Sequence, residues 1–309
     1  MVKNFTEEYI LINGISQYFL HVHNKSKDVV IMLHGGPGLA NSYVAYYQQP
    51  YLDFCNVVYY DQRGAGKTQL KNKVAPESLS LDILLEDLRQ TIEYVKQKYE
   101  TDRVFLAGHS WGTMLGTQYI IKYPQTITGY IGYGQVVSQA AEDKIWFEHL
   151  KAAVQKSGEQ EDIKILGSVS DSFPNIAREK YFNEYALLFE LELKYGFMAN
   201  DVFEIYGKSP IWTPEDEIQA DGIEKFNQKL YEEILWGYDI RNVKEYKVPI
   251  YYVLGRHDKI TSSTLAAKYF ETIQAPKKDL YWIEDAGHLP DTDNPSAFFS
   301  TVKEIVAQL

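Results

Sequence analysis

The sequence has a single cysteine, Cys55, among its 309 residues, so an intramolecular disulfide is excluded. Cys55 stands beside an apolar run, and we expect a small buried side chain rather than a reactive thiol. Long apolar runs are absent as well, since no window approaches the roughly 20 apolar residues that cross a bilayer. Glu7 and Glu8 occupy the place where a signal peptide needs its apolar stretch. We therefore expect a cytoplasmic protein with no membrane partner.

Clusters of positive charge are also missing. The formal net charge is −11, and no run of lysine and arginine is long enough to neutralise a series of phosphates, which excludes nucleic acid as a partner. The acidic excess is concentrated between residues 138 and 248, which contain 22 acidic and 13 basic side chains. This excess is compatible with solubility alone, or with attraction of a cationic group on a substrate.

The apolar residues form short runs separated by helical patterns. Continuous runs at Val29–Leu33, Val57–Tyr60 and Val104–Ala107 are typical of parallel strands that are covered on both faces. Ile15–Val22 alternates between apolar and polar residues, as a half-exposed strand does. Before the run at Val104, leucines and isoleucines recur at helical spacing after Ser80, which is placed to cap that helix.

This alternation of strands and helices breaks in the second half of the chain. Residues 138–247 are mostly helical in pattern, and strands return at Ile250–Leu254 and Leu280–Ile283. We therefore predict an α/β fold with a mostly parallel, doubly wound sheet. Its core would comprise residues 1–137 and 248–309, and residues 138–247 would form a helical cap, or lid, inserted late in the sheet.

Residues 108–112 read Gly-His-Ser-Trp-Gly, a G-x-S-x-G sequence between a predicted strand and a predicted helix. This is the setting of a nucleophile elbow, a tight strand-to-helix turn that lifts a serine above the sheet. Glycines are needed there because larger side chains would collide. The helix N-terminus also favours developing negative charge. We predict that Ser110 is a nucleophile.

A serine hydroxyl needs a base within hydrogen-bonding reach. In folds with such an elbow the base comes last in the chain, and its carboxylate partner comes between the serine and the base. Asp258 and His288 each follow a late predicted strand, which gives the order Ser110, Asp258, His288. We expect Asp258 to accept the Nδ1–H of His288, so that Nε2 can take the serine proton. His257 and Asp285 are nearby competitors for these roles.

The glycine-rich segment His34-Gly35-Gly36-Pro37-Gly38 follows the first buried strand. In enzymes with this elbow, the corresponding loop supplies one N–H of the oxyanion hole. Pro37 has no N–H, so Gly36 is the candidate donor, together with the N–H of Trp111. We expect His34 to hold the loop through hydrogen bonds rather than to act as a second base.

Two further segments superficially resemble binding sites. Residues 61–68 (DQRGAGKT) end like a phosphate-binding loop, but their glycines are too close together for G-x-x-x-x-G-K-[ST]. We expect Asp61 and Arg63 to form a structural ion pair instead. His21 and His23 lie two apart on one strand face without a third ligand, which favours surface placement over metal binding. We predict no metal and no cofactor.

Five motifs together resemble the proline iminopeptidase family, whose members are capped α/β-hydrolases: HGGPG at 34–38, DQRGAGKT at 61–68, GHSWGTMLG at 108–116, GRHD at 255–258 and AGH at 286–288. The resemblance covers about residues 5–137 and 248–308. It implies the α/β-hydrolase fold and a serine peptidase that removes an N-terminal residue, typically proline. It also implies a triad and an oxyanion hole made of Ser110, Asp258, His288, Gly36 and Trp111.

In that family, glutamates of the cap bind the free amino group of the substrate, and Glu190, Glu192 and Glu204 are the candidates here. His109 departs from the family's usual G-G-S-W-G, and epoxide-hydrolase relatives and lactonases often have histidine there. An esterase or lactonase acting on small carboxylic esters is the alternative enzyme. The alternative of another class is a non-catalytic, hydrolase-like ligand-binding protein. We expect a small molecule or short peptide as substrate, and the oligomeric state is left open.

Overall fold

The computed structural model describes residues 5–197, 202–220, 223–235 and 237–309. Its strands form one sheet in the order β1-β2-β4-β3-β5-β6-β7-β8, in which β1, β2 and β4 pair antiparallel and the other neighbours pair parallel. The strands are β1 (Phe5–Ile12), β2 (Ile15–Val22), β3 (Val29–Leu33), β4 (Asn56–Tyr60), β5 (Val104–His109), β6 (Ile127–Tyr133), β7 (Ile250–Gly255) and β8 (Lys278–Ile283). The predicted α/β fold with a mostly parallel sheet is confirmed.

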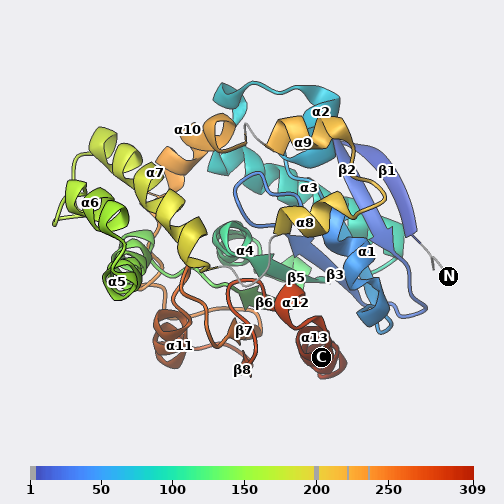
Figure 1. Ribbon diagram of the computed structural model, residues 1–309. Helices are drawn as coiled ribbons and strands as arrows, with labels where there is room; N and C mark the ends of the chain where they lie inside the picture. The colour runs from blue at the N-terminus through green and yellow to red at the C-terminus, as the bar shows by residue number, and fades with distance from the viewer. Residues whose placement is uncertain (1–4, 198–201, 221–222, 236) are drawn as a thin grey trace.

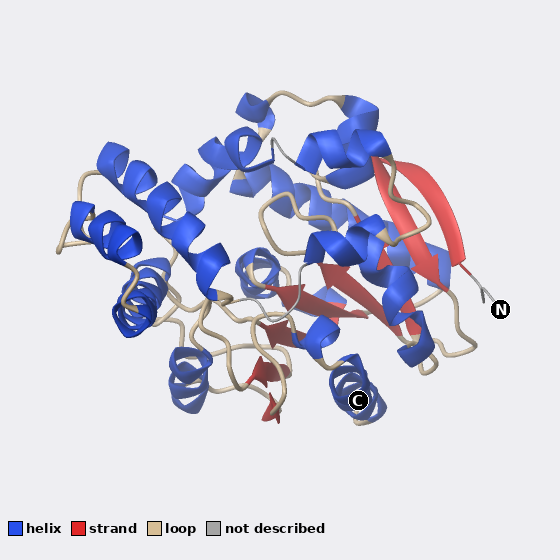
Figure 2. Ribbon diagram, in the orientation of Figure 1, coloured by secondary structure: helices blue, strands red, loops and turns tan. Residues whose placement is uncertain are grey.

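Helices cover both faces of this sheet and also extend beyond one end of it (Figure 1; Figure 2). The helices are α1 (Ala45–Gln48), α2 (Gly66–Asn72), α3 (Leu81–Tyr99), α4 (Trp111–Lys122), α5 (Gln139–Ser157), α6 (Gln160–Ser168), α7 (Arg178–Tyr195), α8 (Val202–Gly207), α9 (Pro214–Ala220), α10 (Ile223–Leu235), α11 (Ser263–Thr272), α12 (Pro290–Asp293) and α13 (Pro295–Ala307). As predicted, Ser80 caps α3, and its hydroxyl accepts the N–H of Ile83 at 3.3 Å. No helix of the described ranges is both long and apolar enough to span a bilayer.

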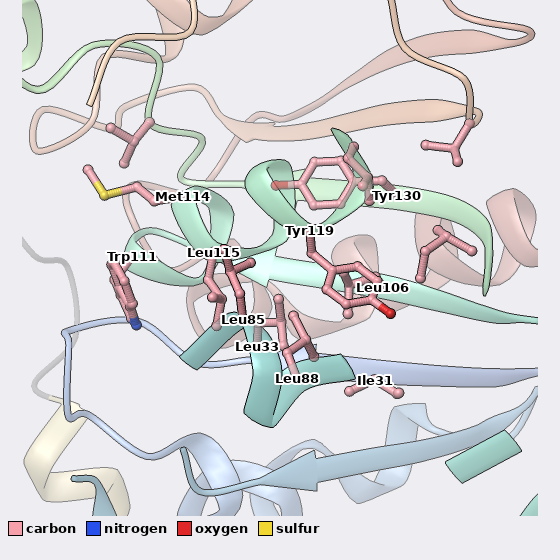
Figure 3. Close-up of a cluster of buried hydrophobic side chains, with 14 of the residues drawn as sticks. Ile31, Leu33, Leu85, Leu88, Leu106, Trp111, Met114, Leu115, Tyr119 and Tyr130 are labelled. Carbon is pink, nitrogen blue, oxygen red and sulfur yellow. The ribbon is translucent and has the colours of Figure 1, made fainter. Parts of the chain in front are cut away.

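The central strands send alternate side chains into two apolar layers. Ile31 and Leu33 of β3 belong to the layer under α3, α4 and α11, whereas Val30 and Met32 belong to the layer under α1 and α13. Cys55 is fully buried in the second layer, as predicted. Figure 3 shows the first layer, where side chains of the sheet, α3 and α4 gather: Ile31, Leu33, Leu106, Leu85, Leu88, Trp111, Met114, Leu115 and Tyr119.

Helices α5 to α10 lie between β6 and β7 in the chain and pack in two different ways. Helices α5 and α7 bury an apolar cluster of their own, including Trp146, Phe147 and Leu188. Helices α8 and α10 instead contribute Tyr206 and Leu230 to the two layers of the sheet. In Figure 1, α5, α6 and α7 accordingly lie together at the left, on the side of the molecule opposite β1 and β2.

The expected ion pair between Asp61 and Arg63 is wrong, because Arg63 pairs with Asp87 of α3. The guanidinium binds this carboxylate through two hydrogen bonds, Nε to Oδ2 at 2.8 Å and Nη2 to Oδ1 at 3.0 Å. Asp61 instead accepts the N–H of Lys67 at 2.8 Å. The Nη2 group of Arg63 also donates to the carbonyl of Asn13 at 2.9 Å, so the pair ties the β1–β2 turn to α3.

The expected surface placement of His21 is also wrong, because β2 is covered by the end of α3. The His21 side chain is fully buried, with Nε2 2.8 Å from the Glu8 carboxylate and Nδ1 3.0 Å from the Tyr99 hydroxyl. Burial lowers its pKa to about 4, despite the neighbouring charge of Glu8. The edge strand β1 was not predicted at all, since apolar Tyr9 and Leu11 are exposed together with Thr6 and Glu7, so that its alternation is weak.

Replacing Asp87 by alanine should destabilise the fold strongly. The substitution leaves the buried Arg63 guanidinium without its counter-charge, which costs about 3–5 kcal/mol of unfolding free energy. Urea denaturation of Asp87→Ala measures this loss. The matched control is Glu86→Ala on the same helix, which removes a partly exposed pair with Arg89 and should cost about 1 kcal/mol or less. Equal losses in the two variants would contradict the structural role of the Arg63–Asp87 pair.

Candidate active site

The predicted site residues follow the carboxyl ends of neighbouring parallel strands. The loop of Gly36 follows β3, Ser110 follows β5, Asp258 follows β7 and His288 follows β8. Since parallel strands end at one edge of a sheet, the topology brings these four segments to the same edge. Crevices at this edge are where open α/β sheets bind ligands.

Ser110 occupies the strained turn that the sequence predicts. Its φ of 49° and ψ of −117° lie in a region that non-glycine residues rarely adopt. The turn leaves no room for side chains on either side, since a Cβ at Gly108 would lie 2.6 Å from the carbonyl oxygen of Gly112. A Cβ at Gly112 would lie 2.3 Å from the carbonyl oxygen of Leu33. Ser110 itself remains partly exposed, at the N-terminus of α4.

Asp258 and His288 form a buried hydrogen-bonded pair. The Nδ1 atom of His288 lies 3.0 Å from Oδ2 of Asp258. Burial alone would lower the pKa of His288, but the charge and hydrogen bond of Asp258 outweigh burial and raise it. Burial opposes the charged form of Asp258, yet His288 and the hydrogen bonds of Thr261 keep its pKa below the ordinary value. The pair therefore has the electrostatics of a base oriented by an ionised acid.

His109 connects the elbow to this pair. Its Nε2 donates to the backbone carbonyl of His288 at 2.8 Å, and the two imidazole rings lie 4.7 Å apart between centroids. Burial lowers the pKa of His109 to about 3, so it stays neutral. The space is tight, because a Cβ at Gly134 would lie 3.0 Å from Cε1 of His288 and 3.2 Å from Cδ2 of His109. The residue before Ser110 thus holds the backbone of the predicted base.

The loop at residues 34–38 packs directly against the elbow. A Cβ at Gly35 would lie 2.8 Å from Nδ1 of His109 and 3.5 Å from Cβ of Ser110. Gly36 has a φ of 104°, a conformation suited to glycine, and its N–H and that of Trp111 remain the predicted oxyanion donors. Trp111 begins α4, where the first N–H groups have no partner within the helix.

His34 holds this loop, as predicted. Its Nδ1 donates to the carbonyl of Gly35 at 2.8 Å, and its Nε2 accepts the N–H of Gln62 at 3.1 Å. These two bonds require one neutral tautomer, which agrees with a pKa that burial lowers to about 4. The side chain of Gln62 also accepts the indole N–H of Trp111 at 3.0 Å. Gln62 therefore links the DQRG segment to the elbow, a role that the motif alone did not reveal.

The three predicted substrate-binding glutamates lie in different environments. Glu192 of α7 is buried, accepts the indole N–H of Trp146 at 2.5 Å, and its charge raises the pKa of His288. Glu190 is exposed on the same helix. Glu204 is exposed on α8 and pairs with Lys208 at 2.5 Å. Glu192 is thus the predicted cap acid whose charge reaches the Asp258–His288 pair, and the roles of Glu190 and Glu204 stay predictions.

Two other residues of the site were not indicated by the sequence. The Thr261 hydroxyl donates to Oδ2 of Asp258 at 2.8 Å and lies 3.3 Å from Nδ1 of His288. Glu142 of α5 is buried and binds the N–H of Ser262 at 2.6 Å. A threonine three residues after the acid is a weak signal, and the partner of Glu142 is a backbone group that leaves no sequence pattern.

The competitors of the predicted triad lie at the surface. His257 and Asp285 are both exposed, although each is close in sequence to a residue of the buried pair. Among the described residues, no cluster of three or more histidine, cysteine, aspartate or glutamate side chains could hold a metal ion.

Replacing Gly112 by alanine should disrupt the elbow. The added Cβ would meet the Leu33 backbone at 2.3 Å, so α4 must move away from β3. Overpacking of this kind costs about 1–3 kcal/mol of unfolding free energy, which urea denaturation measures. The control is Gly167→Ala in α6, where a Cβ meets nothing within 4 Å and helix propensity predicts a gain of up to about 1 kcal/mol. A fully stable Gly112→Ala variant would contradict the close approach of α4 to β3.

Comparison with known proteins agrees with this fold. Residues 28–295 match the alpha/beta hydrolase fold family. A probable aminopeptidase, YbaC, of Bacillus subtilis (strain 168) is 23% identical over 305 residues, which cover 96% of this chain and 92% of the relative. A protein named proline iminopeptidase from Heyndrickxia coagulans is also 23% identical, over 98% of this chain and 99% of its own.

A solved structure that is named for another activity shares the fold. An esterase from Exiguobacterium antarcticum is 16% identical, with a TM-score of 0.56 over 99% of this chain and 100% of its own. At this identity the likeness concerns the fold alone, so it does not choose between peptide and ester substrates. The chain belongs to the α/β-hydrolase fold family, and it is a hydrolase whose relatives include proteins named proline iminopeptidase.

Proposed function

We propose that the protein is a serine aminopeptidase that releases N-terminal proline or a small residue from short peptides. The observation that carries this proposal is the buried Asp258–His288 pair, whose imidazole packs against the residue preceding the strained Ser110. Plain ligand binding requires neither the pair nor the strained turn, so both favour an enzyme over a non-catalytic binding protein.

In the proposed mechanism, Ser110 Oγ attacks the carbonyl carbon of the N-terminal residue while Nε2 of His288 takes the hydroxyl proton. The N–H groups of Gly36 and Trp111 stabilise the oxyanion. His288 then gives the proton to the leaving amine, and the C–N bond breaks to leave an acyl-enzyme. Water, deprotonated by His288, attacks this ester, and the amino acid leaves as the proton returns to Ser110. Asp258 stays ionised and stabilises the imidazolium in both halves.

The preference for a free amine rests on Glu192. A substrate ammonium next to the scissile carbonyl has to lie near the base, and the charge of Glu192 reaches His288 from the cap. The relatives named proline iminopeptidase and probable aminopeptidase, which match nearly the whole chain, support the same substrate class. An esterase uses the same triad without an amine-binding acid, so the two functions differ in their dependence on Glu192.

Prolyl-β-naphthylamide should be cleaved much faster than its N-acetyl analogue. Glu192→Gln should lower kcat/KM for the free-amine substrate by roughly 10–100-fold, the worth of one charged hydrogen bond. At a pH well above the His288 pKa, where the base is neutral in both proteins, hydrolysis of p-nitrophenyl acetate should change far less. The control is Glu179→Gln, at an exposed position of the same helix. The variants Glu190→Gln and Glu204→Gln test the other two predicted acids. Ser110→Ala gives the background rate. Equal rates on the two prolyl substrates would refute the aminopeptidase assignment and favour the esterase.

The rate should also depend on pH in a defined direction. His288 has to be neutral to act as a base, and its pKa is raised above 6.5, so kcat/KM should fall as the pH drops through a value above 6.5. Asp258→Asn removes the charge and the hydrogen bond that contribute most to raising this pKa. It should move the acidic limb to lower pH and reduce kcat by a factor on the order of 10⁴. A wild-type limb already below 6.5 would contradict the proposed pair.

A further inference from the structure

Glu142 lies at the point where the chain leaves the sheet for the cap. It belongs to the first turn of α5, a few residues after the end of β6, and its side chain is only 2% exposed. Its Oε2 accepts the N–H of Ser262 at 2.6 Å, and its Oε1 accepts the N–H of Val137 at 3.4 Å. One carboxyl group therefore joins two backbone segments that are more than a hundred residues apart.

Ser262 ends the turn that begins with Asp258. Within this turn Oδ1 of Asp258 accepts the N–H groups of Ile260 and Thr261, both at 2.9 Å, while Oδ2 accepts the Thr261 hydroxyl. The start of the turn is thus organised by the Asp258 carboxylate itself, and the end is fixed by Glu142. A shift of Ser262 would carry with it the neighbouring Thr261, which touches both Asp258 and His288.

The other partner, Val137, belongs to the junction between the sheet and the cap. Its carbonyl accepts the N–H of Ile240, where the chain returns from the cap, at 2.9 Å. Next to it the N–H of Gln139 donates to the carbonyl of Tyr238 at 3.1 Å. The entry and exit of the inserted segment are therefore bound to one another, and Glu142 binds this junction to the turn of Asp258.

Two charged groups act on Glu142: Asp258 from the loop after β7, and Asp143 from its own helix. Burial raises the pKa of Glu142 to about 8, and the charges of Asp258 and Asp143 act in the same direction. The hydrogen bonds from Ser262 and Val137 oppose this shift. Near neutral pH, Glu142 is mostly uncharged and adds little repulsion to the ionised Asp258. Asp143 is buried beside it but faces the cap, where it accepts the Tyr181 hydroxyl at 2.9 Å and the Gln139 amide at 2.7 Å.

We propose that Glu142 is a positioning residue that holds the 258–262 turn, and through it the Asp258 carboxylate, against the cap junction. The inference rests on the proposed function, in which Asp258 orients His288. Glu142 touches neither the substrate nor the reacting atoms. It acts by keeping the acid in place, so its loss should change the proton affinity of His288 as well as the stability of the fold.

The test compares Glu142→Ala, Glu142→Gln and Asp143→Asn with the wild-type protein. The pKa of His288 is measured by NMR titration, and its resonance is assigned by its loss in His288→Gln. In parallel, kcat/KM for p-nitrophenyl acetate is followed from about pH 5 to 9, a range that includes the ordinary pKa of histidine. We expect Glu142→Ala to lower the His288 pKa and to move the acidic limb of kcat/KM in the same direction. The fall in activity should lie in kcat rather than KM.

Glu142→Gln should bring the His288 pKa and kcat part of the way back from the alanine variant to the wild-type values. Its amide oxygen can still accept the N–H of Ser262, whereas its NH₂ group cannot replace the second acceptor. If the alanine variant does not fold, the same NMR titration and pH profile are measured on Glu142→Gln. Asp143→Asn removes an equally buried acid of the same helix turn, so it should lower Tm without moving the His288 pKa.

The positioning role is overturned if the Glu142 variants lower Tm but keep the wild-type His288 pKa, as Asp143→Asn is expected to do. Failure of the proposed function has a different signature: the wild-type protein would show neither Ser110-dependent turnover nor labelling by a fluorophosphonate. The NMR titration needs no turnover, so it decides the role of Glu142 in either case.

Discussion

The close approach of α4 to β3 is the constraint on which the rest of the site depends. Gly112 of α4 lies so near the backbone of Leu33 that no side chain fits between them. The same contact fixes the N-terminus of α4, where Ser110 adopts its strained conformation, and the end of β3, where the glycine-rich loop begins. Backbone packing thereby positions the predicted nucleophile and the predicted oxyanion donors relative to each other, independently of side-chain hydrogen bonds.

The sheet and the elbow could be predicted because their signals are local. Strands that are buried on both faces are continuous apolar runs, and a tight turn with no room for side chains requires glycine at 108 and 112. The pairing of Asp258 with His288 followed from chain order alone. The partner of Arg63 could not be found in this way, because Asp87 lies on a helix 24 residues further along and nothing in the local sequence identifies it.

The inserted segment was harder to interpret for two physical reasons. Its helices bury side chains partly against each other and partly against the sheet, so no single apolar stripe tells which surface each helix covers. Its many acids also look alike in sequence, although Glu192 and Glu142 are buried and Glu190 is exposed. Hydrogen bonds from backbone N–H groups, such as those to Glu142, leave no trace in residue identity.

The separate apolar cluster of α5 and α7 has a consequence for how this protein can change. Because these helices bury Trp146, Phe147 and Leu188 among themselves, substitutions there change this cluster without removing apolar contacts from the sheet. Selection can therefore change α5 and α7 while the sheet stays the same, and the hydrogen bond between Val137 and Ile240 marks where the inserted segment and the sheet have to stay matched.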